Sequence, residues 1–245
     1  MFELETTYWW FVGRRIILAE TIQRHLASPV AQALDIGCGT GGNFPILSRF
    51  SKAVMGLDTS PQALGYCRSR GWNTVGLMQK DGMLPFADET VDLVTLFDIL
   101  EHVADERPLL GEIRRVLRPD GLLIVTVPAF QFLWSEHDVA LHHYRRYTRR
   151  NLTRLLADEG LKIISASYVI TFSFPLIVLY RMLKGALNFF SSDTAKTSHV
   201  RLPSPLNTFF IRILAWESKL LAYTTFPFGT SVLVVATKDA HPARI

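Results

Sequence analysis

The sequence predicts an α/β fold in which a mostly parallel sheet is covered by helices on both faces. Short apolar runs alternate with stretches of helical character from residue 31 to residue 128. The first of these runs leads directly into a glycine-rich turn, LDIGCGTGG at residues 34–42. Parallel strands are buried on both faces and joined by crossover helices, so this alternation is their typical sequence pattern.

Helices and strands are predicted in alternation along the first half of the chain. Residues 14–26 predict an amphipathic helix, because their apolar residues fall loosely on one face. In a later helix, Ser60 suits the cap, Pro61 the first position and Gly71 the end. Further helices are expected at 43–50 and 106–117, strands at 31–36, 53–57, 73–78, 91–97 and 122–128, and a turn, RPDG, at 118–121.

After Pro128 the pattern changes. A helix is predicted at 151–159, a sixth strand at 161–169 and a last strand at 230–238. Between these two strands lie about sixty strongly apolar residues that the alternating pattern does not require. Within them, residues 206–223 can form a helix with apolar residues broadly on one side.

Composition narrows the class of protein. The 245 residues are 49% hydrophobic and 20% charged, which indicates a globular protein. A net charge of +4 and the short basic run RRYTRR do not predict nucleic-acid binding. Cys38 and Cys67 form neither a disulfide framework nor a metal-ligand pattern, so we expect no metal. The N-terminal stretch lacks the order of a signal peptide, and a cytoplasmic protein is expected.

The glycine-rich turn predicts a nucleotide-like ligand. Its glycines fit G-x-G-x-x-G, which also occurs in nicotinamide and flavin enzymes. Asp35, two residues before the first glycine, would be a poor neighbour for a pyrophosphate and suits an amino group. Asp58 ends the next strand, where an acid can bind a ribose diol, and Asp81 can accept from an adenine amine. S-adenosylmethionine has these three features, and a dinucleotide remains the alternative.

Four stretches resemble the class I S-adenosylmethionine-dependent methyltransferases, and in particular the group that includes the ubiquinone and menaquinone methyltransferases. They are LDIGCGTGG, GLDTS, KDGMLPFADETVDLVTLFDILEHV and LRPDGLLIVTVP, in order within residues 31–128. The resemblance implies one Rossmann-like domain with a seven-stranded, mostly parallel sheet and an antiparallel last strand. Its core would be about 14–170 and 229–239, with a helical insertion at about 171–228.

The resemblance also implies which residues bind S-adenosyl-L-methionine. Asp35 and the glycine backbone would face the methionine part, Asp58 and Thr59 the ribose and adenine, Asp81 and the Gly82 amide the adenine edge, and Phe97 and Asp98 the sulfonium. An arginine of YWWFVGRR, with Arg14 favoured over Arg15, would meet the cofactor's carboxylate. The expected cofactor residues are Arg14, Asp35, Gly37, Cys38, Gly39, Asp58, Thr59, Asp81, Gly82, Phe97 and Asp98. Cys38 is interpreted as a small buried residue and not as a nucleophile.

The loop after the fifth strand holds the candidate general bases, His137, His142 and His143. Imidazole suits proton transfer near neutral pH, and α/β sheets place their sites at this edge. Equally, these histidines and the neighbouring arginines could simply bind carboxylates, with Asp138 pairing with Arg145 or Arg146. Glu101 and His102 rank behind this loop as catalytic candidates.

These observations predict methyl transfer to an oxygen, or less favourably a carbon, of a small or lipid-linked acceptor such as a quinone or glycan. A cofactor-binding regulatory protein and an aminopropyl transferase are the alternatives. The apolar segment at 171–228 carries basic residues at intervals, which is typical of helices that lie at a bilayer surface. We expect a lid that touches the inner face of the membrane, with a packed lid or a dimer contact as alternatives.

Overall fold

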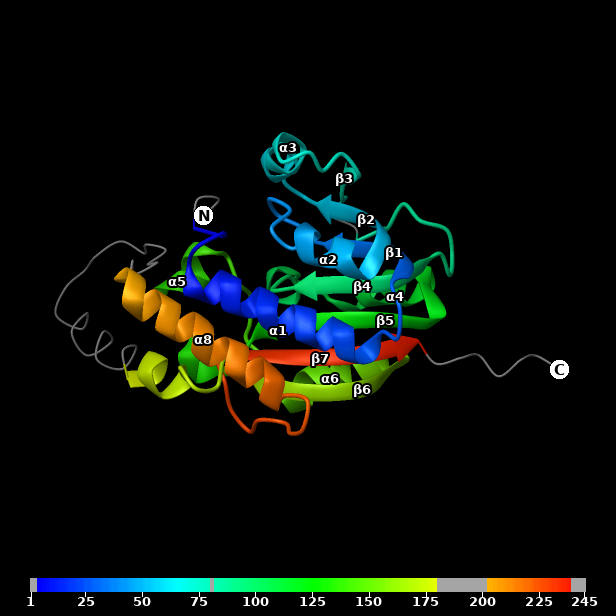
Figure 1. Cartoon of the computed structure of the whole chain (residues 1–245). Coiled ribbons are helices and arrows are strands. Elements are labelled where there is room, and N and C mark those ends of the chain that lie inside the picture. The colour runs from blue at the N-terminus through cyan, green and yellow to red at the C-terminus, as the bar shows by residue number, and fades with distance from the viewer. Residues whose placement is uncertain (1–3, 80–81, 180–201, 239–245) are drawn as a thin grey trace.

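The computed structural model describes residues 4–79, 82–179 and 202–238, and its centre is one seven-stranded sheet (Figure 1). The strand order is β3-β2-β1-β4-β5-β7-β6. Neighbouring strands are parallel except that β7 runs antiparallel to both β5 and β6. The strands are β1 (Val30–Ile36), β2 (Ser51–Asp58), β3 (Val75–Leu77), β4 (Val91–Phe97), β5 (Leu117–Pro128), β6 (Leu161–Val169) and β7 (Ser231–Lys238).

The predicted fold class is confirmed, and one local prediction is wrong. The sequence RPDG at 118–121 was expected to form a turn before the fifth strand, but β5 already begins at Leu117. The pairing of β4 with β5 shifts register between Val91↔Leu117 and Leu93↔Leu122. The four residues therefore form an irregularity inside one long strand, because a bulge absorbs extra residues without ending the pairing of the strand.

Helices cover both faces of the sheet, and each layer has its own buried apolar cluster. One face carries α1 (Trp9–His25), α2 (Phe44–Phe50), α3 (Pro61–Ser69) and α8 (Ser204–Leu220). The other carries α4 (Arg107–Val116) and α6 (Arg149–Asp158). Shorter helical turns, η1 (Leu100–His102), η2 (Gln131–Leu133) and α5 (Glu136–Ala140), lie in the connections after β4 and β5.

The N-terminal helix and the helix of the apolar insertion lie side by side and run in the same direction (Figure 1). Asn207 of α8 accepts the backbone N–H of Trp9 at 2.8 Å and donates to Thr7 O at 2.8 Å, so it caps the start of α1. At the other end, Arg24 of α1 donates to Leu221 O at 2.7 Å. The two helices therefore satisfy each other's terminal backbone groups.

The insertion is anchored to the sheet by a buried carboxylate. Glu217 of α8 accepts the backbone N–H groups of Ile170 at 2.5 Å, Thr171 at 2.8 Å and Phe172 at 3.2 Å. Burial raises the pKa of Glu217, and the three N–H donors partly offset this effect. The end of β6 and α8 are thus one packed unit.

The helix of the insertion, α8, packs into the core. Phe210 and Leu214 of α8 are buried in the apolar cluster beneath α1, so this helix is a component of the core layer. No helix within the described residues has the length and apolar character needed to cross a bilayer. Residues 180–201, which belong to the same predicted insertion, lie outside the described part of the chain.

Candidate cofactor and acceptor site

The glycine-rich turn joins β1 to α2 in left-handed backbone conformations. Gly37, Gly39 and Gly41 have φ values of +70°, +55° and +77°. A Cβ atom on Gly37 would lie 2.0 Å from Cδ1 of Ile99, whereas a Cβ on Gly39 would meet nothing within 4 Å. Gly37 is therefore required by packing against Ile99, and the space beside Gly39 is where a ligand can approach the backbone.

Asp35 is almost fully buried at the end of β1, below this turn. Its Oδ1 accepts a 2.6 Å hydrogen bond from Thr95, and its Oδ2 is only 3.4 Å from Asn43 Nδ2. Burial raises the pKa of Asp35 to about 6, despite the opposing effects of Thr95, Asn43 and Arg14. The long contact to Asn43 leaves Oδ2 with capacity for a stronger, cationic donor.

Asp58 ends β2 and its carboxylate organises the adjoining turns. Oδ2 accepts the backbone N–H of Gly39 at 2.8 Å, and Oδ1 accepts that of Ser60 at 2.8 Å. Each carboxylate oxygen has two lone-pair sites, so both can still accept from a ribose diol. Ser60 caps α3 as predicted, by accepting from the N–H of Ala63 at 3.2 Å. Thr59, between Asp58 and Ser60, is exposed.

Cys38 points away from the turn and into the core. Its side chain is buried near Gly56 and Phe44, and burial raises the pKa of its thiol. Only the backbone of Cys38 can therefore face a cofactor, which agrees with the expectation of a small buried residue. The second cysteine, Cys67, is also buried and donates to Gly39 O at 3.2 Å.

The predicted adenine-edge pair is only partly described. Asp81 lies outside the described residues. Gly82 is buried with φ +79°, and its N–H donates to Gln79 O at 3.3 Å. Its role at the adenine edge stays a prediction, since this N–H is already used within the turn.

Beyond β4, Asp98 stands in a left-handed conformation with φ 54°. Its carboxylate forms an ion pair with Arg14 of α1 and accepts from Thr126 Oγ1 at 3.2 Å. The Arg14 guanidinium also lies 4.5 Å from the ring centre of Trp10. Arg14 and the buried Phe97 both line a small, mostly apolar cavity between α1 and the sheet. Of the two N-terminal arginines, Arg14 is thus the one beside the predicted sulfonium position.

The N-terminal segment covers the glycine-rich turn, and the sequence did not indicate the residue that holds it there. The Glu5 carboxylate accepts from Thr40 Oγ1 at 2.5 Å and from Arg70 at 3.1 Å. Arg15 donates to the backbone O of Glu5 at 2.5 Å. A Cβ on Gly42 would lie 3.2 Å from the Glu5 carboxylate, so the two segments are in close contact.

The structure separates the three candidate histidines of the loop after β5. His137 belongs to α5, and His142 is exposed with a left-handed backbone, φ 57°. His143 is nearly buried, and its Nδ1 lies 2.9 Å from Oδ1 of Asp138. The three side chains are therefore not equivalent, and the imidazole of His143 is oriented by a buried carboxylate.

Asp138 is the centre of this loop. Its carboxylate is fully buried and accepts from Arg146 Nε at 2.8 Å, so Arg146 is its arginine partner, while Arg145 pairs with Glu106. Burial by itself would raise the pKa of Asp138, but the hydrogen bonds from His143 and Arg146 outweigh it and hold the pKa well below its usual value.

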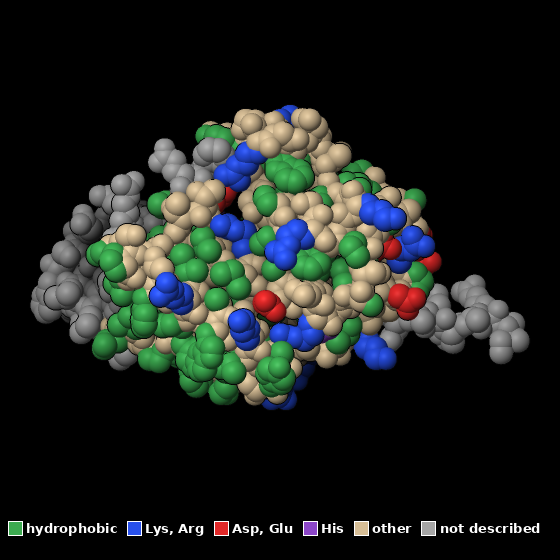
Figure 2. Space-filling model, in the orientation of Figure 1, with side chains coloured by type: hydrophobic (Ala, Val, Ile, Leu, Met, Phe, Trp, Pro, Cys, Tyr) green, Lys and Arg blue, Asp and Glu red, His purple; other side chains and the backbone are tan. Residues whose placement is uncertain are grey.

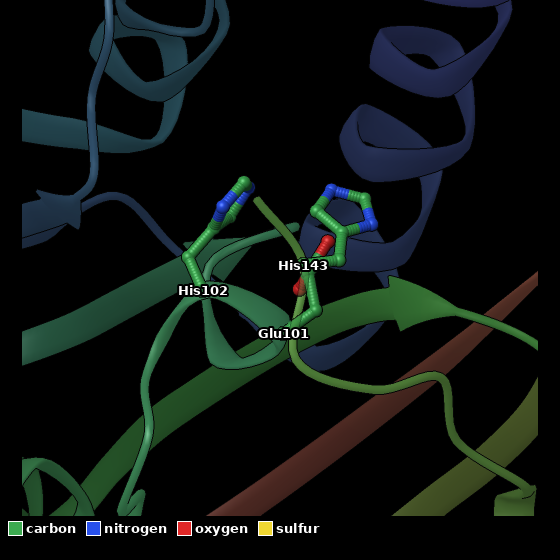
Figure 3. A group of neighbouring side chains, drawn as sticks. All are labelled: Glu101, His102 and His143. Atoms are coloured by element: carbon green, nitrogen blue, oxygen red, sulfur yellow. The ribbon is translucent and has the colours of Figure 1, made fainter. Parts of the chain in front are cut away.

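His143 meets Glu101 and His102, the pair that the sequence analysis ranked lower (Figure 3). The backbone N–H of Tyr144 donates to Glu101 O at 2.7 Å, which fixes the loop against η1. The rings of His102 and His143 lie edge to face, with their centres 4.6 Å apart. Within the described residues, neither carboxylate oxygen of Glu101 has a hydrogen-bond partner, although the side chain is fully buried.

Burial also determines the protonation of this group. Burial, followed by the charge of Asp98, raises the pKa of Glu101 well above its usual value. Burial and the neighbouring His143 lower the pKa of His102. The site therefore favours neutral forms of both side chains when nothing charged is bound to it.

The comparison with known proteins matches the region that holds the glycine-rich turn and its acids. The family model described as a methyltransferase domain matches residues 34–125, from the glycine-rich turn through most of β5. This range contains Asp35, Asp58 and Asp98, which the geometry groups at one edge of the sheet. Residues 34–125 are therefore similar to a methyltransferase domain, within the fold of the class I S-adenosylmethionine-dependent methyltransferases.

Curated relatives match between half and two thirds of this chain. A "Probable S-adenosylmethionine-dependent methyltransferase" of Mycobacterium tuberculosis is 30% identical over 161 residues, which are 64% of this chain and 57% of the relative. A demethylmenaquinone methyltransferase of Tropheryma whipplei is 33% identical over 132 residues, 52% of this chain and 54% of the relative. The chain thus spans little more than half the length of these relatives.

Solved structures share the fold of this chain at low identity. The methyltransferase in a complex with the Haloferax volcanii Trm112 activator is 18% identical with a TM-score of 0.62, covering 98% of this chain and 92% of its own. Geranyl diphosphate C-methyltransferase from Streptomyces coelicolor is 19% identical with a TM-score of 0.59, covering 90% and 76%.

Proposed function

We propose that this methyltransferase transfers the methyl group of S-adenosylmethionine to an oxygen of a small or lipid-linked acceptor. The observation that carries the proposal is the juxtaposition of an acid-lined glycine turn with an imidazole pair. Asp35 and Asp58 offer carboxylates for an amino group and a ribose diol. Gly37 of the turn packs against Ile99, the residue before η1, and η1 carries His102 with His143 beside it.

The chemistry requires little covalent participation by the protein. The acceptor's oxygen forms a bond to the methyl carbon, and the electrons of the carbon–sulfur bond pass to sulfur, which loses its positive charge. Alignment of the two reacting atoms supplies much of the acceleration. Asp98 and Phe97, at the end of β4, are suited to surround the sulfonium, and Arg14 to meet the cofactor's carboxylate.

An oxygen acceptor must also lose its hydroxyl proton. Among His137, His142 and His143, we assign this function to His143, because Asp138 orients its ring and Glu101 and His102 lie beside it. His142 is exposed and His137 belongs to α5, outside that group. A carbon acceptor is the less favoured possibility.

The acceptor can be identified by incubating the purified chain with isotopically labelled S-adenosylmethionine and cell lipid or glycan fractions. We expect a labelled product, and we expect His143→Asn to reduce its rate at least tenfold while His142→Asn retains it. If no fraction accepts label while the cofactor still binds, the alternative of a cofactor-binding regulatory protein is favoured. If His143→Asn is fully active, the proton is removed elsewhere or the acceptor needs no base.

The folded protein keeps an exposed apolar surface, which would suit a lipid-linked acceptor. Figure 2 shows hydrophobic side chains gathered over α8 and the segment next to it. Exposed members of this surface are Phe172, Leu176, Leu179, Phe209, Trp216 and Tyr223. Arg212 and Lys219 are exposed on α8 and would suit anionic lipid head groups.

We therefore propose peripheral membrane contact through this apolar surface. Deleting the whole insertion is a poor test, since Phe210, Leu214 and Glu217 belong to the packed core. The combined substitution Phe209→Glu and Trp216→Glu should abolish flotation with anionic liposomes, whereas Leu77→Glu, at an exposed residue of β3, should not. Full-length protein that never floats, even at low salt, would leave a lid or dimer contact as the function of this surface.

A further inference from the structure

The side chains of Glu101, His102 and His143 form a cluster whose ligand atoms all lie within 4.8 Å of one another. We propose that these three residues bind a divalent transition-metal ion of the Zn²⁺ type at the acceptor side of the methyltransferase site. Two imidazoles and one carboxylate are a ligand set that binds zinc in catalytic sites, where a fourth position remains open for water or substrate.

The orphaned carboxylate is the first observation that supports the ion. Glu101 is 0% exposed, and neither of its oxygens accepts a hydrogen bond within the described residues. An unsatisfied buried carboxylate is costly, and each such group in a folded protein calls for an explanation such as an ion. A cation between Glu101 and the two imidazoles would remove this cost.

The group behind His143 is the second, independent observation. Metal-binding histidines usually donate their other ring N–H to a carboxylate or a backbone carbonyl, which fixes the ring and its tautomer. His143 has this arrangement, since Nδ1 lies 2.9 Å from Asp138 Oδ1 and Nε2 remains for the cluster.

The geometry is open enough for an ion to enter and close enough for it to bind. Ligand atoms about 2.1 Å from one ion are at most about 4 Å apart, so a spacing of up to 4.8 Å must contract by about an ångström. His102 reaches the surface although part of its ring is buried, which provides a path from solvent. Figure 3 shows the three side chains converging on one region.

Such an ion would deepen the proposed function, on which this part of the inference rests. It would bind the acceptor's oxygen in its open position and make the hydroxyl proton more acidic, so that the proton leaves to water. His143 would then act on the acceptor through the ion and not as a free base. A catechol-like or other chelating hydroxyl acceptor fits this chemistry better than an isolated alcohol.

Metal binding can be measured without any acceptor. Full-length protein treated with a chelator and dialysed is titrated with Zn²⁺ by calorimetry and with Co²⁺ by visible absorption, and S-adenosylhomocysteine is titrated into the same samples. We expect one ion per chain and visible Co²⁺ bands typical of imidazole ligands. Glu101→Gln and His143→Asn should each weaken Zn²⁺ binding at least tenfold, and Asp138→Asn, which reaches the cluster through His143, by about 10–100-fold.

The matched control is His142→Asn, which removes the adjacent histidine outside the cluster and should leave Zn²⁺ affinity unchanged. Asn tolerates the left-handed backbone at this position, and circular dichroism verifies that each variant is folded. A wild-type chain that binds S-adenosylhomocysteine but no stoichiometric metal, or whose metal affinity is the same in Glu101→Gln and His143→Asn, overturns the metal site and leaves methyl transfer standing. If folded wild-type protein binds neither the metal ion nor S-adenosylhomocysteine, both proposals are overturned.

Discussion

The protonation of Asp35 predicts a specific pH dependence of cofactor binding. In the free protein the pKa of this carboxyl is about 6, chiefly because it is buried. The cofactor's ammonium group needs the ionised form, so binding lowers this pKa and releases a proton below about pH 6. Cofactor affinity should therefore fall as the pH is lowered through 6.

The size of the effect follows from the same value. With a pKa of about 6, Asp35 is about one-tenth protonated at pH 7 and about nine-tenths at pH 5. The dissociation constant for S-adenosylhomocysteine should then rise about tenfold between pH 7 and pH 5, which corresponds to about 1.4 kcal/mol. Between pH 7 and pH 8 it should hardly change.

Titration calorimetry in buffers of different ionisation enthalpy measures both the affinity and the released proton. Asp35→Asn is the matched variant, because it keeps the size of the side chain and cannot titrate. It should bind more weakly at pH 8, by about ten- to a hundredfold, since a hydrogen bond to a charged group contributes about 1.5–3 kcal/mol. A flat wild-type profile between pH 7 and 5, or the same slope in Asp35→Asn, would refute the assignment of Asp35 to the amino group.

The same shift makes a second measurement possible without any cofactor. A carboxyl whose folded pKa is raised favours the folded state while it is protonated. The free protein should consequently lose stability as the pH rises from about 4 to about 6, by at most about 3 kcal/mol. This contribution to the pH dependence should be absent from Asp35→Asn.

Three further predictions concern the cover of the site. Glu217→Ala should lower the free energy of unfolding by roughly 3 kcal/mol or more, because three backbone N–H donors, those of Ile170 and Thr171 buried, lose their acceptor; urea unfolding measures this, with Lys219→Ala on the exposed face as control. Gly13→Ala should cost about 1–3 kcal/mol, since the new Cβ would lie 2.1 Å from Leu214 Cδ1, and in a double-mutant cycle Leu214→Ala should relieve part of that cost. Arg14→Ala should weaken S-adenosylhomocysteine binding about tenfold or more and Arg15→Ala much less, as calorimetry can establish; equal losses would mean that both act only through the fold of the N-terminal segment.

Much of the sheet was predictable because its signals are local. The apolar run at 91–97 is bounded by Thr90 and Asp98, and β4 has the same limits, Val91 and Phe97. β6 likewise spans the predicted residues 161–169. Ser60 followed by Pro61 marked the start of α3 for the same reason, since a cap acts within one turn. Asp35 and the glycines lie within eight consecutive residues, and the cofactor prediction added to them only Asp58 and Asp81, each placed after a predicted strand.

The limits of each element were less predictable where packing outweighs local preference. α1 begins at Trp9, five residues before the predicted start, because Asn207 caps it from a helix almost two hundred residues away. Likewise, β5 continues through RPDG, whose composition is typical of a turn, since β4 pairs on both sides of it. Backbone groups satisfied by distant partners leave no mark in the neighbouring sequence.

The sequence alone therefore determined the fold class and the glycine turn with the adjoining Asp35, because each depends on residues close together in the chain. Only the tertiary structure decided that His143 and not His137 or His142 meets Glu101 and His102, that Glu5 closes over Thr40, and that α8 is a core helix with an apolar outer face. The reason is physical: side-chain contacts between segments depend on how the layers pack, and that packing minimises buried unsatisfied groups over the whole molecule and not within any one stretch of sequence.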